Sequence, residues 1–443
     1  MKKIAAFIVF LVLISSVCLA VDLSIVPGLS AKNLLLYLLV VWIAFDAVLN
    51  SRRGGLLHQQ IDYMTLHGAF IVLIVLAVLS AATCVFVLQY DKYWPLYAII
   101  SLKASLFDNY LMLFVFLAAI RDSREAIWMA KAILILMTIA MTLSLIEMFD
   151  FMQLGIMDPR ADGRLQGPLL GSNEYGALMA FYLPTAFVFA YLARGKWRAL
   201  WIFSGFVYLM VMVFSASRGA VVGLFGGAFV GVMLFRRYIS ARALVQSFIA
   251  VAIVGAIAVA LLAIQHGDLL YTRYIETTIA TNIYDQSSGR TEIWAAALSL
   301  MSAEPVTFLV GFGWATFDLM NEWGSHNEYL RYIFELGLIG LSFLLFIYFA
   351  VLYEVRSAAR YVSADARLIL IGFACGYLSI IVSTLFNHMS APWLFVWGQT
   401  GLMLRFACSE RALAGSDQNR GQSPEASVPS LRHGKNRVAQ ADL

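Results

Sequence analysis

Long hydrophobic runs dominate the pattern of hydrophobic and polar positions along the chain. A helix needs about 20 predominantly apolar residues to cross the hydrocarbon core of a bilayer. About twelve runs approach or reach this length, and they lie at roughly 4–21, 33–50, 66–88, 96–119, 126–148, 173–193, 199–216, 219–235, 244–264, 331–352, 367–386 and 392–406. The pattern therefore predicts an all-α, polytopic integral membrane protein whose transmembrane domain occupies residues 1–408.

The first run can be interpreted in two ways. Lys2 and Lys3 precede its apolar core, as in a secretory signal peptide. The run at 4–21 is nevertheless long enough to span a bilayer, and the residues that end at Cys18 match a lipoprotein cleavage site poorly. We therefore expect the first helix to be retained.

The composition agrees with a membrane protein. Hydrophobic residues make up 61% of the 443 positions and charged residues 13%, whereas soluble domains have roughly 45–50% and 25%. This excludes an ordinary soluble enzyme, a disordered protein and a basic nucleic-acid-binding protein. The four cysteines show no metal-ligand or disulfide spacing, so we expect neither a zinc site nor a disulfide framework.

The basic residues indicate how the helices are directed. If the N-terminus is cytoplasmic, most of the 31 Lys and Arg fall on the inner side, as the positive-inside rule requires. Both termini are then cytoplasmic. The basic residues that remain outside are Lys32, Lys92, Lys103, Arg160, Arg164, Arg218, Arg273, Arg290 and Arg331. Because basic residues are disfavoured there, these few are the candidates for function.

Two outer loops, 149–172 and 265–330, are longer than a turn. The second is large, acidic and aromatic. We expect a helix at 290–303, ended by Pro305, a turn at Gly311 and Gly313, and a further helix that starts near His326 and continues into the next span. Residues 409–443 are polar and rich in Ser, Gly and Gln, which predicts a disordered cytoplasmic tail.

Arg218 lies in a tight outer turn, in Ser215-Ala-Ser-Arg218-Gly219, ahead of a glycine-rich run that favours close helix packing. It is either an interfacial arginine that extends to the membrane surface or a clamp for phosphate oxygens, which guanidinium groups bind in bidentate geometry. Arg290 is expected at a helix N-terminus, which itself favours anions, or in a salt bridge of the acidic loop. Arg160 and Arg164 are either surface charges or further anion ligands.

His326 is the candidate general base, because a histidine titrates near neutrality and can accept a proton from a hydroxyl. The alternative is a structural role at a helix start. Arg331 and Glu335 are spaced to pair along one helix face. No outer loop has an Asp-x-Asp pair, and no nucleotide-binding fingerprint is present, so we expect no metal and no cofactor. Asp46, Asp108 and Glu147 would suit a proton-coupled transporter, but we expect them at membrane interfaces.

Several of these segments together resemble the O-antigen ligase family. His326-Asn327, followed nine residues later by Gly337-Leu-Ile-Gly340, is similar to its signature. Further similar segments are Ser217-Arg218-Gly219, Gly289-Arg290 with Trp294, and Arg164-Leu-Gln-Gly167 through Asn173. The similarity covers about 160–350, in order and on the predicted outer side.

The resemblance implies a GT-C-type fold in the bacterial inner membrane, with one large periplasmic loop. It implies metal-free transfer of a glycan from undecaprenyl pyrophosphate to an acceptor hydroxyl, on lipid A–core or another glycan. In this interpretation Arg218 and Arg290 hold the pyrophosphate, His326 is the base, and Arg164, Arg160, Arg273, Asn327 and Arg331 contribute to substrate binding. Membrane lipid is the other partner, and nucleic acid is not.

Ligase and polymerase are the two main alternatives within this family. Its polymerases resemble this chain in an Arg-x15-Gly spacing, which fits Arg160 to Gly176 and Arg273 to Gly289. The His326-Asn327 pair favours a ligase, which is the function we expect. A transporter or flippase is the more distant alternative.

Overall fold

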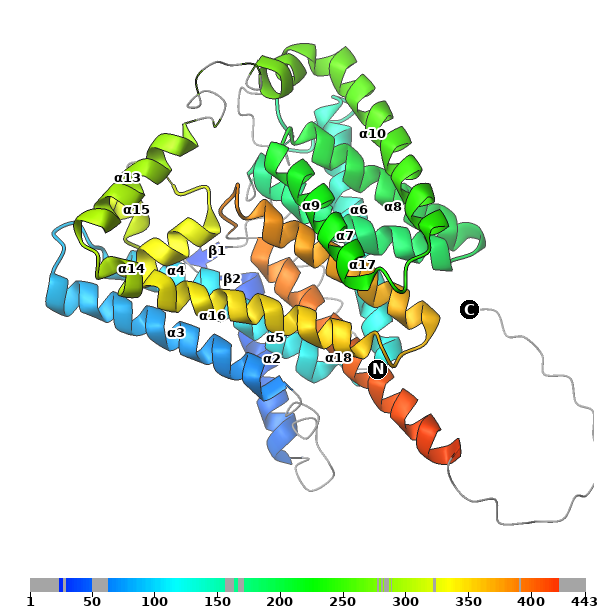
Figure 1. Cartoon of the computed structure of the whole chain (residues 1–443), viewed down its shortest axis with the longest axis horizontal. Coiled ribbons are helices and arrows are strands. Elements are labelled where there is room, and N and C mark those ends of the chain that lie inside the picture. Colours follow the sequence, from blue (N-terminus) through cyan, green and yellow to red (C-terminus); the bar gives the residue numbers. More distant parts are fainter. Residues whose placement is uncertain are drawn as a thin grey trace, which may run out of the picture.

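The structure is a computed structural model that describes residues 24–26, 29–49, 63–155, 163–165, 171–276, 279, 282, 287, 289–321, 324–389 and 392–421. Within these residues it is helical, apart from a hairpin of β1 (Ser24–Val26) and β2 (Leu29–Ser30). The predicted span at 4–21 lies outside the described residues. Figure 1 shows a bundle of long helices, with a smaller group of short helices at one end.

Eight of the described helices are long and apolar enough to cross a membrane, and nine if one bent pair counts as a single span. They are α3 (Met64–Thr83) with η4 (Cys84–Leu88), α4 (Pro95–Leu102) with η5 (Lys103–Phe107) and α5 (Asp108–Ala119), α6 (Ser123–Met148), α7 (Ser172–Leu192), α8 (Gly195–Phe214), α9 (Arg218–Phe235), α16 (Glu328–Ala358) and α17 (Ala364–Ser383). The bent pair is Val251–Ile264 and His266–Glu276, at 117°. The chain is therefore a polytopic membrane protein.

Two further predicted spans, 33–50 and 392–406, correspond to helices that are not long and apolar enough to count as membrane spans. α2 (Ala31–Leu49) has a shorter apolar stretch, Ala31–Phe45. α18 (Pro392–Gly421) contains buried Gln399 and Arg405, which lower its hydropathy. Both helices nevertheless contact α5 in the bundle.

The helix α18 extends beyond the boundary at 408 that the sequence predicted. Residues 409–421 continue the helix instead of starting a disordered tail. Arg411 donates to Glu354 Oε2 at 3.0 Å, which ties this extension to α16. The Glu, Arg, Ala and Leu of residues 410–414 are also good helix formers.

The centre of the bundle is α17, which lies between α7 and α9 (Figure 1). The glycines of α9 make this contact possible. A Cβ at Gly223 would lie 2.6 Å from the Ser379 carbonyl oxygen, and one at Gly227 would lie 2.2 Å from the Ser379 nitrogen. The expected close packing of the glycine-rich run is confirmed, because these helix backbones approach to a distance that only glycine permits.

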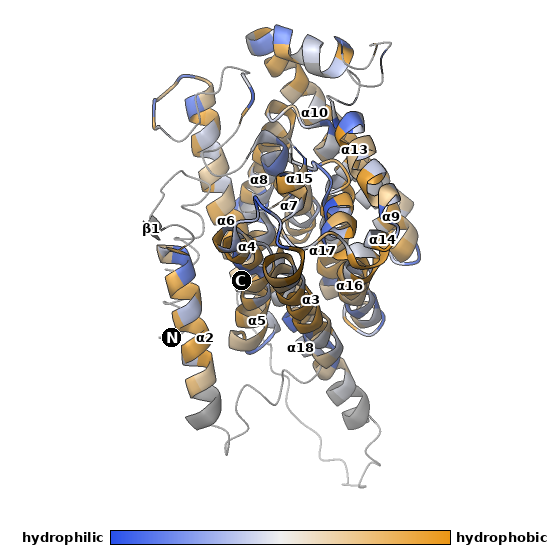
Figure 2. Ribbon diagram, turned by 90° about the vertical axis from the view of Figure 1, so that its left-hand side faces the viewer, coloured by the Kyte–Doolittle hydropathy of each residue, from blue (hydrophilic) through white to orange (hydrophobic). Residues whose placement is uncertain are grey.

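Large hydrophobic side chains remain exposed along the outside of the bundle. Examples are Phe45 of α2, Leu79 of α3, Phe229 of α9 and Phe349 of α16. Figure 2 shows hydrophobic residues along most of the length of α2 and α3. An apolar outer surface of this kind suits contact with lipid chains rather than water.

Asp108 differs from the interfacial placement expected for it. It is 1% exposed, inside the span Pro95–Ala119. Its carboxylate accepts hydrogen bonds from Tyr37 Oη at 2.7 Å and from Asn33, and it pairs with Lys103 Nζ at 2.8 Å. These partners explain the burial, because a carboxylate can be buried when its charge and its lone pairs are satisfied. They join α2 to the start of α5. Glu147 lies at the end of α6, where it accepts from the Gly155 N–H.

The predicted large loop is folded into helices. After α10 (Ala241–Leu270) and η6 (Tyr271–Glu276) come α13 (Arg290–Ala303), α14 (Thr307–Val310) and α15 (Phe317–Met320). The helix expected at 290–303 is confirmed, as is the turn, where Gly311 and Gly313 have φ values of 79° and 122°. A small apolar core, formed by Ala297, Met301, Phe312, Phe317, Leu330 and Phe334, holds this region to the start of α16.

Glycines also fix how this loop meets α16. Gly337 breaks α16 with a φ of 65°, and a Cβ there would lie 2.2 Å from the Leu309 carbonyl. The backbone N–H groups of Phe312 and Gly313 donate to the carbonyls of Phe334 and Glu335 at 2.7 and 3.0 Å. The first part of α16 is thus held against the loop, which positions the residues just before it.

Candidate functional site

Arg218 is the first residue of α9, and a tight turn leads into it. Ser217 is the N-cap and accepts from the Ala220 N–H at 3.3 Å, while Ala216 has a left-handed φ of 48°. The Arg218 side chain is half-buried. The guanidinium group and the positive end of the helix dipole therefore lie together, and both favour an anion.

Arg164 lies against the same turn. Its Nε donates to the Ser215 carbonyl at 2.9 Å, its Nη2 donates to Asn173 Oδ1 at 2.8 Å, and its side chain is 9% exposed. The Leu165 N–H donates to the Phe214 carbonyl at 3.0 Å. The structure thus brings together two of the arginines that the sequence singled out. These contacts also hold Arg164 firmly in place.

The broken helix α10–η6 returns to this point. Tyr274 of η6 is close enough to interact electrostatically with both Arg164 and Arg218. A Cβ at Gly163 would lie 3.7 Å from His266 Nδ1, at the bend. We call Arg164, Arg218 and Tyr274 the arginine cluster.

His326 lies just before α16, and α13 lies close to it. It has a left-handed φ of 46° and keeps contact with solvent. Trp294 of α13 donates from its indole nitrogen to the Ser325 carbonyl at 2.9 Å, which fixes α13 against this segment. Arg290, the first residue of α13, lies within electrostatic range of His326.

The surroundings of His326 lower its pKa. Partial withdrawal from water has the largest effect, followed by the positive charges of Arg290 and His388, and Asp318 opposes them. Each of the first three disfavours the protonated imidazole. His326 is therefore neutral near pH 7, which is the form that can accept a proton.

Asn327 and Arg331 have well-defined structural contacts. Asn327 is the N-cap of α16, and its side-chain oxygen accepts from the Leu330 N–H at 3.0 Å. The expected pair of Arg331 and Glu335 is confirmed, with 3.2 Å between Nε and Oε1. Arg331 lies in the first turn of α16, after His326 along the chain, and is 6% exposed.

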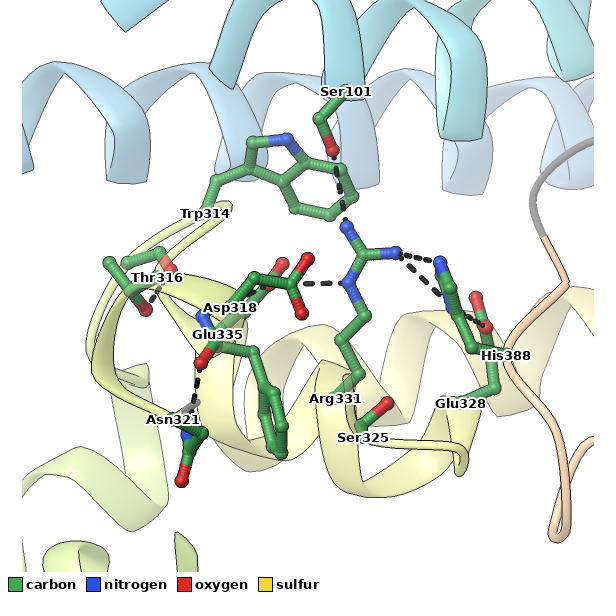
Figure 3. A network of polar contacts seen from close by, with 12 residues as sticks. Ser101, Trp314, Thr316, Asp318, Asn321, Ser325, Glu328, Arg331, Glu335 and His388 are labelled. Carbon is green, nitrogen blue, oxygen red and sulfur yellow. Dashed lines mark hydrogen bonds and ion pairs between the residues drawn. The ribbon is translucent and has the colours of Figure 1, made fainter. Parts of the chain in front are cut away.

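Figure 3 shows a polar network around Arg331 that the sequence did not reveal. Arg331 donates to Ser101 Oγ at 3.1 Å and contacts His388 Nε2 at 2.6 Å, and its guanidinium lies 5.5 Å from the Trp314 ring. His388 in turn contacts Glu328. Nothing in the sequence distinguished His388, because its partners lie far away along the chain.

The segment Thr384–Met389, after α17, connects the arginine cluster with the region of His326. On one side Phe386 packs against Gly219, where a Cβ would lie 2.8 Å from the Phe386 Cβ. On the other side the Glu328 N–H donates to the Thr384 carbonyl at 3.0 Å. Arg218 and His326 are therefore each within two residues of a position that contacts this short segment.

Two further arginines, Arg160 and Arg273, were expected to contribute to substrate binding. Arg160 lies outside the described residues, and so does the side chain of Arg273, whose backbone belongs to η6. Within the described parts of the chain, no three His, Cys, Asp or Glu side chains are grouped so that they could hold a metal ion.

The fold and this site define a polytopic membrane protein with a cationic and histidine-containing site at one end of its helix bundle. Residues 203–347, less than half of the chain, match the family model described as O-antigen ligase. No curated protein matches the chain significantly. The family implies glycosyl transfer of the ligase or polymerase type, with lipid-linked glycans as substrates.

The matched residues contain part of the site, namely Arg218, Arg290 and His326. Arg164, Ser101 and His388 lie outside the matched residues, although the structure joins them to the same site.

Proposed function

We propose that the protein is an O-antigen ligase that works at the periplasmic face of the bacterial inner membrane. It would transfer a glycan from undecaprenyl pyrophosphate to a hydroxyl of lipid A–core, with inversion and without a metal. The observation that carries this proposal is a neutral His326 within electrostatic range of Arg290, in a turn that the segment Thr384–Met389 links to the turn of Arg218.

The arginines fit the departure of the lipid pyrophosphate. When the bond between the anomeric carbon and the phosphate oxygen breaks, negative charge grows on that oxygen. Arg218, held at the N-terminus of α9, and Arg290, at the N-terminus of α13, supply positive charge there. Prearranged cations stabilise such a charge more in the transition state than in the ground state. Arg164 adds charge and fixes the turn that carries Arg218.

His326 fits the activation of the acceptor. A neutral imidazole accepts the proton of the acceptor hydroxyl as its oxygen bonds to the anomeric carbon, on the face opposite the leaving group. After partial withdrawal from water, the same charge of Arg290 that favours the pyrophosphate contributes most to lowering the pKa of His326. Asn327 and Arg331 then support His326 through the helix that follows it, in addition to the substrate contacts first expected of them.

The membrane arrangement follows from the same proposal. Both termini are cytoplasmic, the fold is of the GT-C type, and the helices α13, α14 and α15 form the periplasmic region above the site. The broken helix α10–η6 bends by 117° beside the arginine cluster. Such a bend suits a lipid substrate, whose chain lies among the helices while its pyrophosphate reaches the arginines.

A polymerase of the same family is the second candidate. Its expected spacing pairs Arg160 with Gly176 and Arg273 with Gly289. The presence of each glycine is also explained by its local structure in this chain. A Cβ at Gly176 would lie 2.6 Å from Ser215 Oγ, and Gly289 is the N-cap of α13 with a φ of 80°. The spacing is thus explained without polymerase activity, which favours the ligase.

The glycan phenotype of a deletion strain tests the proposal. We expect lipid A–core without polymer, and polymer that accumulates on its lipid carrier. Complementation with Arg218→Ala or His326→Ala should leave this phenotype in place at normal protein level, because each removes a group required for transfer. Single repeat units on the core would instead indicate a polymerase, and normal glycan in both variants would contradict the proposed site.

A further inference from the structure

The segment Thr384–Met389 is held at both ends by one residue. The Glu328 N–H donates to the Thr384 carbonyl at 3.0 Å. The Glu328 carboxylate accepts from His388 Nδ1 at 2.7 Å and from the Met389 N–H at 3.4 Å through the same oxygen, Oε2. Glu328 is 3% exposed and lies two residues after His326. The position of the segment is thus tied directly to the turn that carries His326.

His388 contacts two oppositely charged residues. Arg331 Nη1 lies 2.6 Å from His388 Nε2 and 3.2 Å from Nδ1. Nδ1 also lies 2.7 Å from Glu328 Oε2. His388 is thus held between a guanidinium and a carboxylate, whereas His326 keeps contact with solvent.

Arg331 is itself anchored from two further directions. Glu335 accepts from its Nε at 3.2 Å, and Ser101 of α4 accepts from Nη2 at 3.1 Å (Figure 3). His388 thus contacts a group that is fixed by two helices. A largely buried network of several charged and polar contacts favours one arrangement of these side chains over its alternatives.

The segment and the end of α17 also contact the start of α9, which carries Arg218. Phe386 packs on Gly219, beside Arg218, and Ser383 lies so close to Gly223 that no Cβ would fit between them. A shift of Thr384–Met389 would therefore move it relative to Arg218, to His326 or to both.

We propose that His388 is a positioning residue for glycan transfer. With Glu328 and Arg331 it fixes Thr384–Met389, and this sets the spacing between Arg218 and His326. The inference rests on the proposed function. A displacement of about 1 Å in a catalytic arrangement can lower the rate about 100-fold without loss of substrate binding.

Two substitutions at this position separate hydrogen bonding from packing. His388→Leu removes both hydrogen bonds, whereas His388→Gln retains one donor and one acceptor. The substrate is the lipid-linked glycan extracted from the deletion strain, with the lipid A–core of that strain as acceptor. We expect kcat to fall about 100-fold in His388→Leu with little change in KM, and to recover at least tenfold in His388→Gln. The fall of activity on the acid side should remain in His388→Leu, because His326 is still the base, and it should move to higher pH, because His388 no longer lowers the pKa of His326.

Glu354→Gln is the matched control. It breaks the ion pair of Glu354 with Arg411, at 3.0 Å near the opposite end of α16, and should leave turnover at the wild-type level.

Lack of transfer by the wild-type protein would contradict the proposed function itself. If wild type and control are active, wild-type kcat in His388→Leu would overturn the positioning role. So would loss of the acid-side fall, since His388 would then be the base. If His388→Leu does not fold, His388→Gln decides: near-wild-type kcat supports the role, and an inactive but folded protein contradicts it.

Discussion

At the scale of single residues, His326 and His388 lie near one another but differ in their partners. His388 has both ring nitrogens engaged, by Glu328 and Arg331. His326 keeps contact with solvent, and Arg290 and His388 lower its pKa. The sequence singled out His326 by its motif, but it could not separate the two roles, because these depend on neighbours that only folding brings together.

The charge of Arg290 leads to a prediction on pH dependence. Arg290 disfavours the protonated form of His326, so the Arg290→Gln substitution should raise the pKa of His326. A base works when it is unprotonated, and activity falls as pH drops through its pKa. The acid limb of kcat/KM should therefore move to higher pH, in addition to any loss of donor binding.

Arg411→Gln removes a cation from the other end of the bundle and serves as the control. Its acid limb should coincide with that of the wild type. An acid limb that stays in place in Arg290→Gln, or moves to lower pH, would show that Arg290 does not act on the catalytic base.

At the scale of helices, hydropathy predicted most elements well. The spans from α3 to α9, and also α17, begin and end within a few residues of the predicted runs, while α16 begins near its run but continues to Ala358, beyond the predicted end at 352. The π-helical segment η5, the break at Gly337 and the bend at His266 were not predicted, because each depends on contacts with other helices. The helical extension of α18 was missed because its polar composition resembles a disordered tail.

The close crossing of α9 and α17 gives a prediction on stability. Gly227→Ala should lower the free energy of unfolding by about 1–3 kcal/mol, because the new methyl group would lie 2.2 Å from the Ser379 nitrogen. The measurement is the thermal unfolding midpoint in detergent. Gly255→Ala is the control, since nothing lies within 4 Å of its Cβ position. Equal midpoints for the two variants would refute the close packing.

At the scale of the whole molecule, the site is built from more of the chain than the family match covers. Residues 203–347 contain Arg218, Arg290 and His326. Other contacts of the site come from outside the match: Asn173 of α7 accepts from Arg164, and Ser101 of α4 and His388 after α17 contact Arg331. The order of the motifs predicted that they share one face, but their mutual placement depends on how α17 packs between α7 and α9.

Transfer by the purified protein tests the central claim most directly. Wild type and His326→Ala are reconstituted with the lipid-linked glycan from the deletion strain and lipid A–core, and both glycan transfer and binding of undecaprenyl pyrophosphate are measured. We predict that wild type transfers the glycan, whereas His326→Ala loses at least about 100-fold in rate and still binds undecaprenyl pyrophosphate with wild-type affinity. Transfer by His326→Ala at the wild-type rate would contradict the assignment of the base and of the site around it.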